Sequence, residues 1–226
     1  MNPGSGLPLD SGKLSESPRY RRDTHRYGAH EVILRNVPIG STVLDVGCAT
    51  GYLGAALSAR GCRGWGIERD PSAVTAAEPW YQAVYPIDLD ECDELPWPVR
   101  SFDVVVAADV LEHLRDPHRA LRLLHRQVRP GGRLIVSVPN VAHGSVRLAL
   151  LFGRFSYSST GILDNTHLHL YTFETARELV EAGGFNVERL IGASDHFGAL
   201  LQSRRASRLV RGLLAYNIVV VATPAP

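Results

Sequence analysis

The sequence predicts an α/β fold built around one large sheet. Short apolar runs that end in or near an acidic residue alternate with segments that start like helices. The last run, residues 216–223, is almost uninterruptedly apolar, which indicates a strand buried on both faces. With 226 residues and 45% hydrophobic side chains, the chain can fill the core of one such sheet. We expect a single domain over residues 19–226, after a flexible tail of residues 1–18 rich in Gly, Ser and Pro.

The first predicted strand, residues 43–46, and the turn after it form the most informative stretch. The strand carries an acid, Asp45, and glycines follow at positions 47, 51 and 54. Glycines let a backbone take positive φ and approach a ligand closely, and the first N–H groups of the next helix are unpaired. We therefore expect a small ligand above this turn. The spacing G-x-x-x-G-x-x-G differs from the G-x-G-x-x-G of dinucleotide-binding folds, which argues against a nucleotide-dependent oxidoreductase that binds NAD.

Four more strand-like runs follow in order: residues 64–68, 85–87, 101–108 and, after a Pro-Gly-Gly turn, 133–140. The second strand of the chain ends in Glu68, and Asp88 follows the third. We expect Glu68 to lie beside the first turn, where its carboxylate can accept two hydrogen bonds from a ribose diol. The pattern therefore favours a ligand that contains ribose.

The connection after the fifth strand, residues 141–170, is long for a compact α/β fold. Long connections are commonly functional, and we expect an insertion that covers the substrate. A helix is predicted at residues 173–182, with Thr172 as its N-cap and two glycines as its end. Residues 185–191 then read as a strand, and residues 195–215 as an extra, partly basic segment.

Taken together, these ordered motifs resemble a class I S-adenosylmethionine-dependent methyltransferase, over about residues 27–223. The resemblance implies a Rossmann-like, mostly parallel sheet of seven strands with helices on both faces and the last two strands in reversed order. It also implies that S-adenosyl-L-methionine lies across the carboxyl ends of the first strands. The chain is similar to the bacterial small-molecule group of quinone and secondary-metabolite biosynthesis.

The resemblance assigns part of the cofactor to each motif. The implied cofactor residues are Asp45, Gly47, Cys48, Gly51, Glu68, Arg69, Asp88, Leu89, Ala108 and Asp109. Asp45, Gly47 and Gly51 would line the methionine part. Glu68 would bind the ribose hydroxyls, and Arg69 would cover the adenine face. Asp88 with the Leu89 amide would bind the adenine edge, and Ala108 and Asp109 would lie close to the sulfonium. Ala49 departs from the pattern, because the family commonly has glycine there. Tyr27, in an expected lead-in helix within residues 19–38, is a candidate cofactor contact or a packing residue.

Methyl transfer from a sulfonium is an in-line displacement, so positioning can supply most of the acceleration. Good orientation is worth roughly 7 to 11 kcal/mol, whereas a general base gives roughly 3 to 5 kcal/mol. A hydroxyl acceptor must also lose its proton, which a neutral histidine can take. We predict His113, just past the fourth strand, and His167, near the end of the long connection, as catalytic residues. The alternatives are structural: His113 could be hydrogen-bonded to local backbone at a helix start, and His167 could anchor its loop.

The same residues admit a divalent metal ion. Asp109, Glu112 and His113 form D-x-x-E-H, which is similar to the E-x-x-E-H ligands of quinone and small-RNA methyltransferases, and His167 would be a further ligand. Such a cation could orient an acceptor oxygen and lower its pKa. The first ligand is the shorter Asp, and L-E-H also occurs in relatives without a known metal, so the metal is the less favoured alternative.

We expect an enzyme that methylates a small-molecule acceptor, with O-methylation in secondary-metabolite or sugar biosynthesis as the first choice. N- or C-methylation is the alternative, and a non-catalytic S-adenosylmethionine-binding scaffold is the rival from another class. Phe152, Phe155 and Tyr157 are candidates either for an apolar acceptor pocket or for packing the long connection onto the domain.

The formal net charge of +1 gives no global field that would favour nucleic acid or a membrane surface as a partner. No apolar run reaches the roughly 18 to 20 residues of a membrane span, and no signal-type segment is evident. The three cysteines lack C-x-x-C pairing, so we expect a cytoplasmic protein. Arginines at 115, 119, 122, 126 and 129 recur at steps of four and three, which places them on one helix face, and a second cluster lies at 204, 205, 208 and 211. We expect solvated faces, with an acidic carrier protein as the alternative partner.

Overall fold

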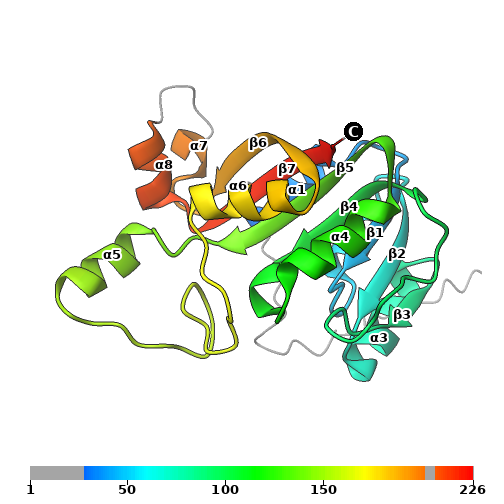
Figure 1. Cartoon of the computed structure of the whole chain (residues 1–226), viewed down its shortest axis with the longest axis horizontal. Coiled ribbons are helices and arrows are strands. Elements are labelled where there is room, and N and C mark those ends of the chain that lie inside the picture. The colour runs from blue at the N-terminus through cyan, green and yellow to red at the C-terminus, as the bar shows by residue number, and fades with distance from the viewer. Residues whose placement is uncertain (1–27, 202–206, 226) are drawn as a thin grey trace, which may run out of the picture.

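The computed structural model describes residues 28–201 and 207–225 (Figure 1). Within these residues, a seven-stranded sheet has the order β3-β2-β1-β4-β5-β7-β6. The strands are β1 (Thr42–Val46), β2 (Arg63–Glu68), β3 (Val84–Pro86), β4 (Phe102–Ala108), β5 (Val128–Pro139), β6 (Phe185–Ala193) and β7 (Asn217–Pro224). Strand β7 runs antiparallel to both of its neighbours, whereas the other pairings are parallel. The predicted fold class and the reversed order of the last two strands are confirmed.

Helices cover both faces of the sheet. They are α1 (Ala29–Asn36), α2 (Tyr52–Ser58), α3 (Pro71–Ala77), α4 (Pro117–Gln127), α5 (Gly144–Leu151), α6 (Phe173–Ala182), α7 (Gly198–Leu201) and α8 (Arg208–Leu214), with short 3-10 turns η2 (Glu78–Trp80) and η3 (Leu111–His113). Figure 1 shows α4 and α6 in front of the sheet. Helices α1 and α2 belong to the core on the opposite face.

Two hydrophobic cores sandwich the sheet because successive side chains of a strand point to opposite faces. In β4, Val105 and Ala107 pack in the core beneath α4 and α6, whereas Val104 and Val106 pack in the core with α1 and α2. Both faces of the central strands are therefore buried, which explains why these strands appear in the sequence as continuous apolar runs.

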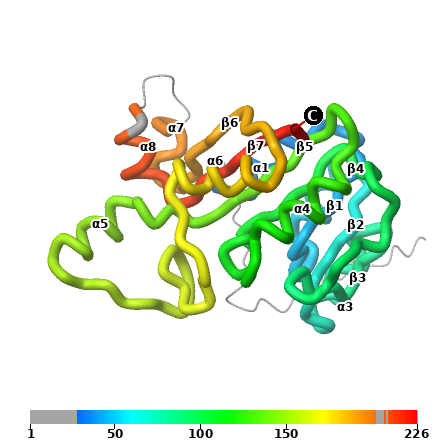
Figure 2. The backbone as a smooth tube through the Cα atoms, viewed as in Figure 1, coloured from blue at the N-terminus to red at the C-terminus, as the bar shows by residue number. Residues whose placement is uncertain are grey.

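The connection from β5 to α6 contains one more helix than expected, α5. Figure 2 shows α5 and the chain after it extending to one side of the sheet before the chain returns to α6. That this connection is an insertion covering the substrate stays a prediction. Helix α6 has the predicted bounds, and Thr172 and Thr175 form a reciprocal capping box at its start.

The predicted single arginine-bearing helix face was wrong at both ends. Helix α4 begins at Pro117, so Arg115 precedes it, and Arg129 lies in β5. Arg115 pairs with Asp90 and Glu91, and Arg129 pairs with Asp103. These arginines are thus bound to acids of the same chain.

Several expectations concern residues outside those that the structure describes. They are the tail at residues 1–18, the candidate contact Tyr27, and Arg204 and Arg205 of the second arginine cluster. Among the described helices, none has the length and apolar character needed to cross a membrane.

Candidate active site

A cavity of about 370 Å³ opens at the carboxyl ends of β1, β2 and β4. Its volume falls within the range of small-molecule pockets. Of the residues predicted for the cofactor and for catalysis, those that line it are Gly47, Glu68, Arg69, Asp88, Leu89, Ala108, Asp109 and His113. Segments far apart in the sequence thus converge on the edge of the sheet where the ligand was expected.

The turn after β1 forms one wall of the cavity. Gly47 has a φ of +68°, and a Cβ atom there would lie 2.6 Å from Val110 Cγ2, so a larger residue does not fit. Ala49 also lines the cavity and has a positive φ of 48°. For an L-residue this left-handed conformation costs roughly 1 to 2 kcal/mol. Ala49 is therefore strained at the position where the resemblance leads one to expect glycine.

Ala49→Gly is expected to raise the free energy of unfolding by about 0.5 to 1 kcal/mol. Relief of the left-handed strain should exceed the entropy that glycine adds to the unfolded chain. Urea denaturation measures the change. Ala76→Gly, inside α3, is the matched control and should lower the free energy of unfolding by about 1 kcal/mol. Similar destabilisation of both variants would contradict the strain.

Asp45 lies beneath this turn and outside the cavity wall. It is buried, and the hydroxyl of Tyr81 donates a hydrogen bond to its Oδ2. The Tyr81 ring fills a slot left by Gly54 and Gly64, where added Cβ atoms would lie 2.4 and 2.8 Å from ring carbons. Burial raises the pKa of Asp45 to about 7; the bond from Tyr81 opposes the rise, and the charge of Glu68 adds to it. Contact between Asp45 and the cofactor stays a prediction.

Tyr81→Phe is expected to destabilise the protein more at pH 8 than at pH 5. The pKa of Asp45 is raised from 3.8 to about 7, so its contribution to stability is present below the unfolded pKa and is lost as pH rises through about 7. At pH 8 the variant removes a hydrogen bond to a carboxylate, worth about 1.5 to 3 kcal/mol; at pH 5 the neutral pair is worth about 0.5 to 1.5 kcal/mol. Urea denaturation at both pH values measures the difference.

The control for this comparison is Tyr85→Phe, since the Tyr85 ring packs against Trp97 and is separate from Asp45. It should change stability little at either pH. An equal loss for Tyr81→Phe at pH 5 and pH 8 would show that the Tyr81 hydroxyl stabilises ionised Asp45 no more than neutral Asp45.

Glu68 is fixed in place by two backbone donors. Its Oε2 accepts the Ala49 N–H at 3.1 Å, and its Oε1 accepts the Asp70 N–H at 2.9 Å. A carboxylate has about four lone-pair sites, so each oxygen keeps capacity for one more donor. Since Glu68 lines the cavity, this carboxylate is prepared to accept two hydroxyl groups of a bound ligand.

Asp109, just after β4, is held by β5 and β7. Its Oδ1 accepts hydrogen bonds from Ser137 Oγ at 2.8 Å and from Asn217 Nδ2 at 3.0 Å. Both lone pairs of this oxygen are thereby used, whereas Oδ2 keeps its own. Asp109 and its neighbour Ala108 line the cavity where the resemblance places the sulfonium.

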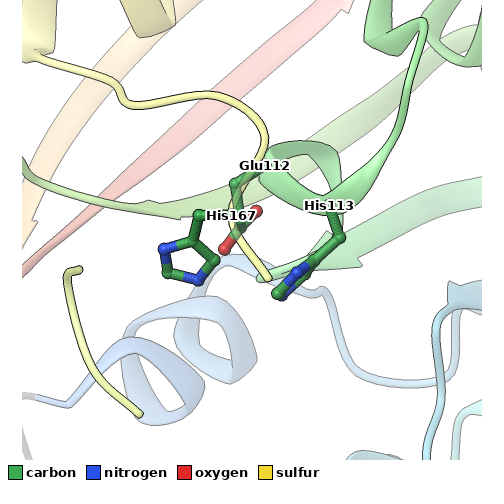
Figure 3. A group of neighbouring side chains, drawn as sticks. All are labelled: Glu112, His113 and His167. Carbon is green, nitrogen blue, oxygen red and sulfur yellow. The ribbon is translucent and has the colours of Figure 1, made fainter. Parts of the chain in front are cut away.

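His113 and His167 meet at one side of the cavity, with ring centroids 4.8 Å apart (Figure 3). The Nδ1 of His113 lies 3.2 Å from the carbonyl of Thr166, and the Nδ1 of His167 lies 3.0 Å from the carbonyl of Ile162. A carbonyl only accepts, and the Thr166 hydroxyl, also 3.2 Å from His113 Nδ1, donates to Asp164 Oδ1. In each neutral ring Nδ1 therefore carries the proton and Nε2 keeps its lone pair. Both rings are thus oriented by backbone; His113 lines the cavity, whereas His167 contacts His113 without being one of the lining residues.

The pKa of His113 is below its ordinary value. Burial is the main cause, and the neighbouring His167 contributes; the Thr166 carbonyl and the carboxylates of Asp164 and Asp109 act in the opposite direction. His113 is therefore largely neutral at pH 7, the state in which an imidazole can accept a proton.

Glu112 completes a group of three side chains that point toward one another in Figure 3. It is fully buried, and within the described residues neither of its oxygens has a hydrogen-bond partner. Burial, helped by the charge of Asp109, raises the pKa of Glu112 well above its ordinary value. One ligand atom from each of Glu112, His113 and His167 lies within 4.8 Å of the other two. This donor set fits a divalent cation, and Asp109 is outside the group.

Some predicted residues lie elsewhere, and some cavity residues were missed. Cys48 and Gly51 do not line the cavity: the Cys48 sulfur packs near Gly66. The cavity residues that the sequence did not single out include His30, Tyr52, Val110, Asp164 and Thr166. Asp164 and Thr166 carried a local signal, since Asp-x-Thr favours the turn in which the Asp164 carboxylate accepts the Thr166 N–H at 2.8 Å.

Comparison with protein families finds one described as "Methyltransferase domain", whose model matches residues 18–190. A probable S-adenosylmethionine-dependent methyltransferase of Mycolicibacterium smegmatis is 30% identical over 91% of this chain and 76% of that protein. A ubiquinone biosynthesis O-methyltransferase of Pseudomonas syringae pv. tomato is 36% identical, and that match spans 45% of each protein. The chain therefore matches under half of the length of this second enzyme.

Solved structures share the fold at low identity. One chain of the complex between the Haloferax volcanii Trm112 methyltransferase activator and a methyltransferase has a TM-score of 0.64 and 20% identity, covering 90% of this chain and 92% of that chain. The cyclase SpnF has a TM-score of 0.62 and 20% identity, covering 87% of this chain and 81% of its own. Because one of these proteins is a cyclase, the fold by itself does not determine the reaction.

Proposed function

The chain belongs to the S-adenosylmethionine-dependent methyltransferases, and on that premise we propose that it methylates a hydroxyl oxygen of a small-molecule acceptor. The observation that carries the choice of oxygen is His113: a neutral imidazole in the cavity wall whose Nε2 is free to accept a proton. Amine and carbon acceptors are the alternatives. The partial match to an O-methyltransferase is consistent with this choice.

S-adenosyl-L-methionine supplies an electrophilic methyl group when bound, and the residues of the cavity fit its chemistry. Glu68 would accept the ribose hydroxyls through its two remaining acceptor sites. Asp88 and the amide of Leu89 would bind the adenine edge, and Arg69 would cover the adenine face. Asp109 Oδ2, next to the expected position of the sulfonium, supplies a carboxylate oxygen close to positive charge.

His113 would then take the acceptor proton at Nε2 as the acceptor oxygen bonds to the methyl carbon and the bond from that carbon to sulfur breaks, with S-adenosylhomocysteine as the leaving group. The Thr166 carbonyl accepts from Nδ1 throughout, so it keeps the ring oriented and stabilises the imidazolium that forms. The Asp164 and Asp109 carboxylates favour that charged state as well. His167 lies against the ring, and we propose that it limits the orientations of His113.

A divalent cation is the second candidate for activating the acceptor, favoured by the buried carboxylate of Glu112, which has no hydrogen-bond partner in the described part of the chain. Glu112, His113 and His167 would hold it, and it would lower the pKa of an acceptor oxygen bound to it. Turnover before and after chelation, with Mg²⁺, Mn²⁺ or Zn²⁺ restored singly, decides between the two. Full activity of the chelated, metal-free protein would exclude the cation.

The proposed function is tested with a labelled methyl donor and a panel of acceptors that present either a hydroxyl or an amine on matched rings. O-methyl products, identified by mass spectrometry and NMR, are expected. Products methylated only on nitrogen or carbon would refute the choice of oxygen. Binding of S-adenosylhomocysteine without any product across the panel would favour the scaffold.

The cellular location and a protein partner are also open to proposal. We infer a cytoplasmic location from the free cysteines Cys48, Cys62 and Cys92. An acidic carrier protein has limited support, because Arg115, Arg119 and Arg129 are paired with acids of the same chain. A test of that partner is glutamate substitution of Arg122 and Arg126, which should leave turnover on free acceptors unchanged.

A further inference from the structure

The segment after β5 has an unusually apolar surface. A surface helix normally buries its apolar side chains and exposes polar ones. In α5, Val146 is the buried residue, and Leu151 is 78% exposed. The exposed large apolar side chains of the segment are Leu148, Leu150, Leu151, Phe152, Phe155 and Tyr157. We call this set the α5 apolar face; a clustered apolar surface of this kind marks an interaction site.

The face is a formed surface. The Arg154 N–H donates to the Ala149 carbonyl at 2.8 Å and closes the end of α5. Beyond the helix, the rings of Phe155 and Tyr157 pack edge to face, with centroids 5.5 Å apart. The end of α5 and the aromatic pair after it are therefore ordered before they meet a partner.

Helix α5 and the chain after it extend away from the sheet, and α5 lies beside α8 (Figures 1 and 2). Asn140 joins the two regions, because its Nδ2 donates to the carbonyls of Gly212 and Ala215 at 2.9 and 2.8 Å. Helix α8 adds one more exposed apolar side chain, Leu209. The same connection carries Asp164 to the cavity, so the face and the active site belong to one stretch of chain.

The charged side chains of the face itself are both positive. Between residues 141 and 163 the only charged side chains are Arg147 and Arg154. In the neighbouring helix α8, the described arginine Arg211 adds a further basic residue. Since the whole chain has a net charge of only +1, this region concentrates positive charge locally. Leucine and aromatic side chains combined with arginines are the composition of segments that lie in the interface of anionic bilayers.

We propose that the α5 apolar face docks on an anionic lipid surface. Its leucine and aromatic side chains would enter the interfacial region, with Arg147 and Arg154 at the level of the headgroups. Docking would be peripheral, because none of the described helices can cross a membrane. The net charge of the whole chain did not predict a membrane partner, because it averages the positive charge near this face with the acidic residues elsewhere.

Charge also distinguishes this partner from a second copy of the chain. In a symmetric dimer built on this face, identical patches would meet, which brings arginines near arginines with no acid of the face to pair them. An anionic surface complements the same arginines. The inference does not depend on which atom the enzyme methylates.

The test is co-sedimentation of the full-length protein with two kinds of vesicle, phosphatidylcholine alone and equal parts phosphatidylcholine and phosphatidylglycerol. Binding to the anionic vesicles alone is expected, and added salt should weaken it. Leu151→Glu combined with Phe152→Glu should lower the partition coefficient at least about tenfold. Arg154→Glu should lower it roughly five- to thirtyfold.

Ile39→Glu is the matched control, because Ile39 is an equally exposed apolar residue, 77% accessible, that precedes β1. It should bind vesicles like the unmodified protein. Each variant should keep its thermal shift with S-adenosylhomocysteine, which separates loss of docking from loss of the fold. Absence of binding to anionic vesicles would overturn the proposal. So would a concentration-dependent dimer that Leu151→Glu with Phe152→Glu abolishes, which would assign the face to a second copy.

Discussion

His113→Ala is expected to lower kcat by about 100- to 10,000-fold, the range typical for loss of a general base. Binding of S-adenosylhomocysteine should change little, because the cofactor contacts are proposed for Glu68, at the end of β2, and for Asp88, just after β3, whereas His113 lies in η3. Single-turnover kinetics with a hydroxyl acceptor and calorimetric titration of S-adenosylhomocysteine measure the two quantities on the same preparation.

His118→Ala is the matched control for this experiment, because His118 is an exposed histidine on α4. It should leave both kcat and affinity unchanged. If His113→Ala retains most of its turnover, positioning alone drives the reaction and the histidine has a structural role. If instead cofactor affinity falls in parallel with kcat, the substitution has disturbed the cavity, and the loss of kcat is no evidence for a general base.

Glu68→Ala is expected to weaken S-adenosylhomocysteine binding by at least about 100-fold, since two charge-assisted hydrogen bonds of about 1.5 to 3 kcal/mol each would be lost. Ligand at about 100 times its dissociation constant should stabilise the unmodified protein by roughly 2.7 kcal/mol, a shift of several degrees in Tm. The same ligand concentration should shift the variant barely at all.

Glu68 also accepts the Ala49 and Asp70 amides, so the variant should unfold at a lower temperature even without ligand. The comparison therefore uses the shift of each protein relative to its own ligand-free state. Glu78→Ala, an exposed acid in η2, is the control and should keep the full shift. A full shift in Glu68→Ala would refute the ribose assignment.

The elements that the sequence predicted well have local causes. Helix α6 begins and ends where expected because Thr172 caps its first turn and the pair Gly183-Gly184 ends it, and both signals lie within a few residues. The central strands could be predicted from continuous apolar runs, because both faces of these strands are buried in the two cores. In contrast, the prediction of one arginine-bearing helix face overlooked a local signal for a helix start. Asp116 caps α4 and Pro117 is its first residue, so Arg115 lies outside the helix.

Local patterns named His113 and His167 as candidates for one site, but the contact that joins them lies between distant segments. His167 meets His113 because the chain near it is attached to η3, where the Glu112 carbonyl accepts the Leu168 N–H at 2.8 Å. The spacing of residues along the sequence does not predict that hydrogen bond. Likewise, a tyrosine at position 81 gives no sign in the sequence that its ring passes between two glycines to reach Asp45.

The slot around Tyr81 has an evolutionary consequence. A methyl group at Gly54 or Gly64 would overlap the ring, while a smaller residue at position 81 would leave a void beside two glycines. Substitutions at these three sites are therefore epistatic: each is harmful singly, and only coordinated changes are tolerated. Among relatives, positions 54, 64 and 81 should covary, with glycine retained wherever the aromatic ring is.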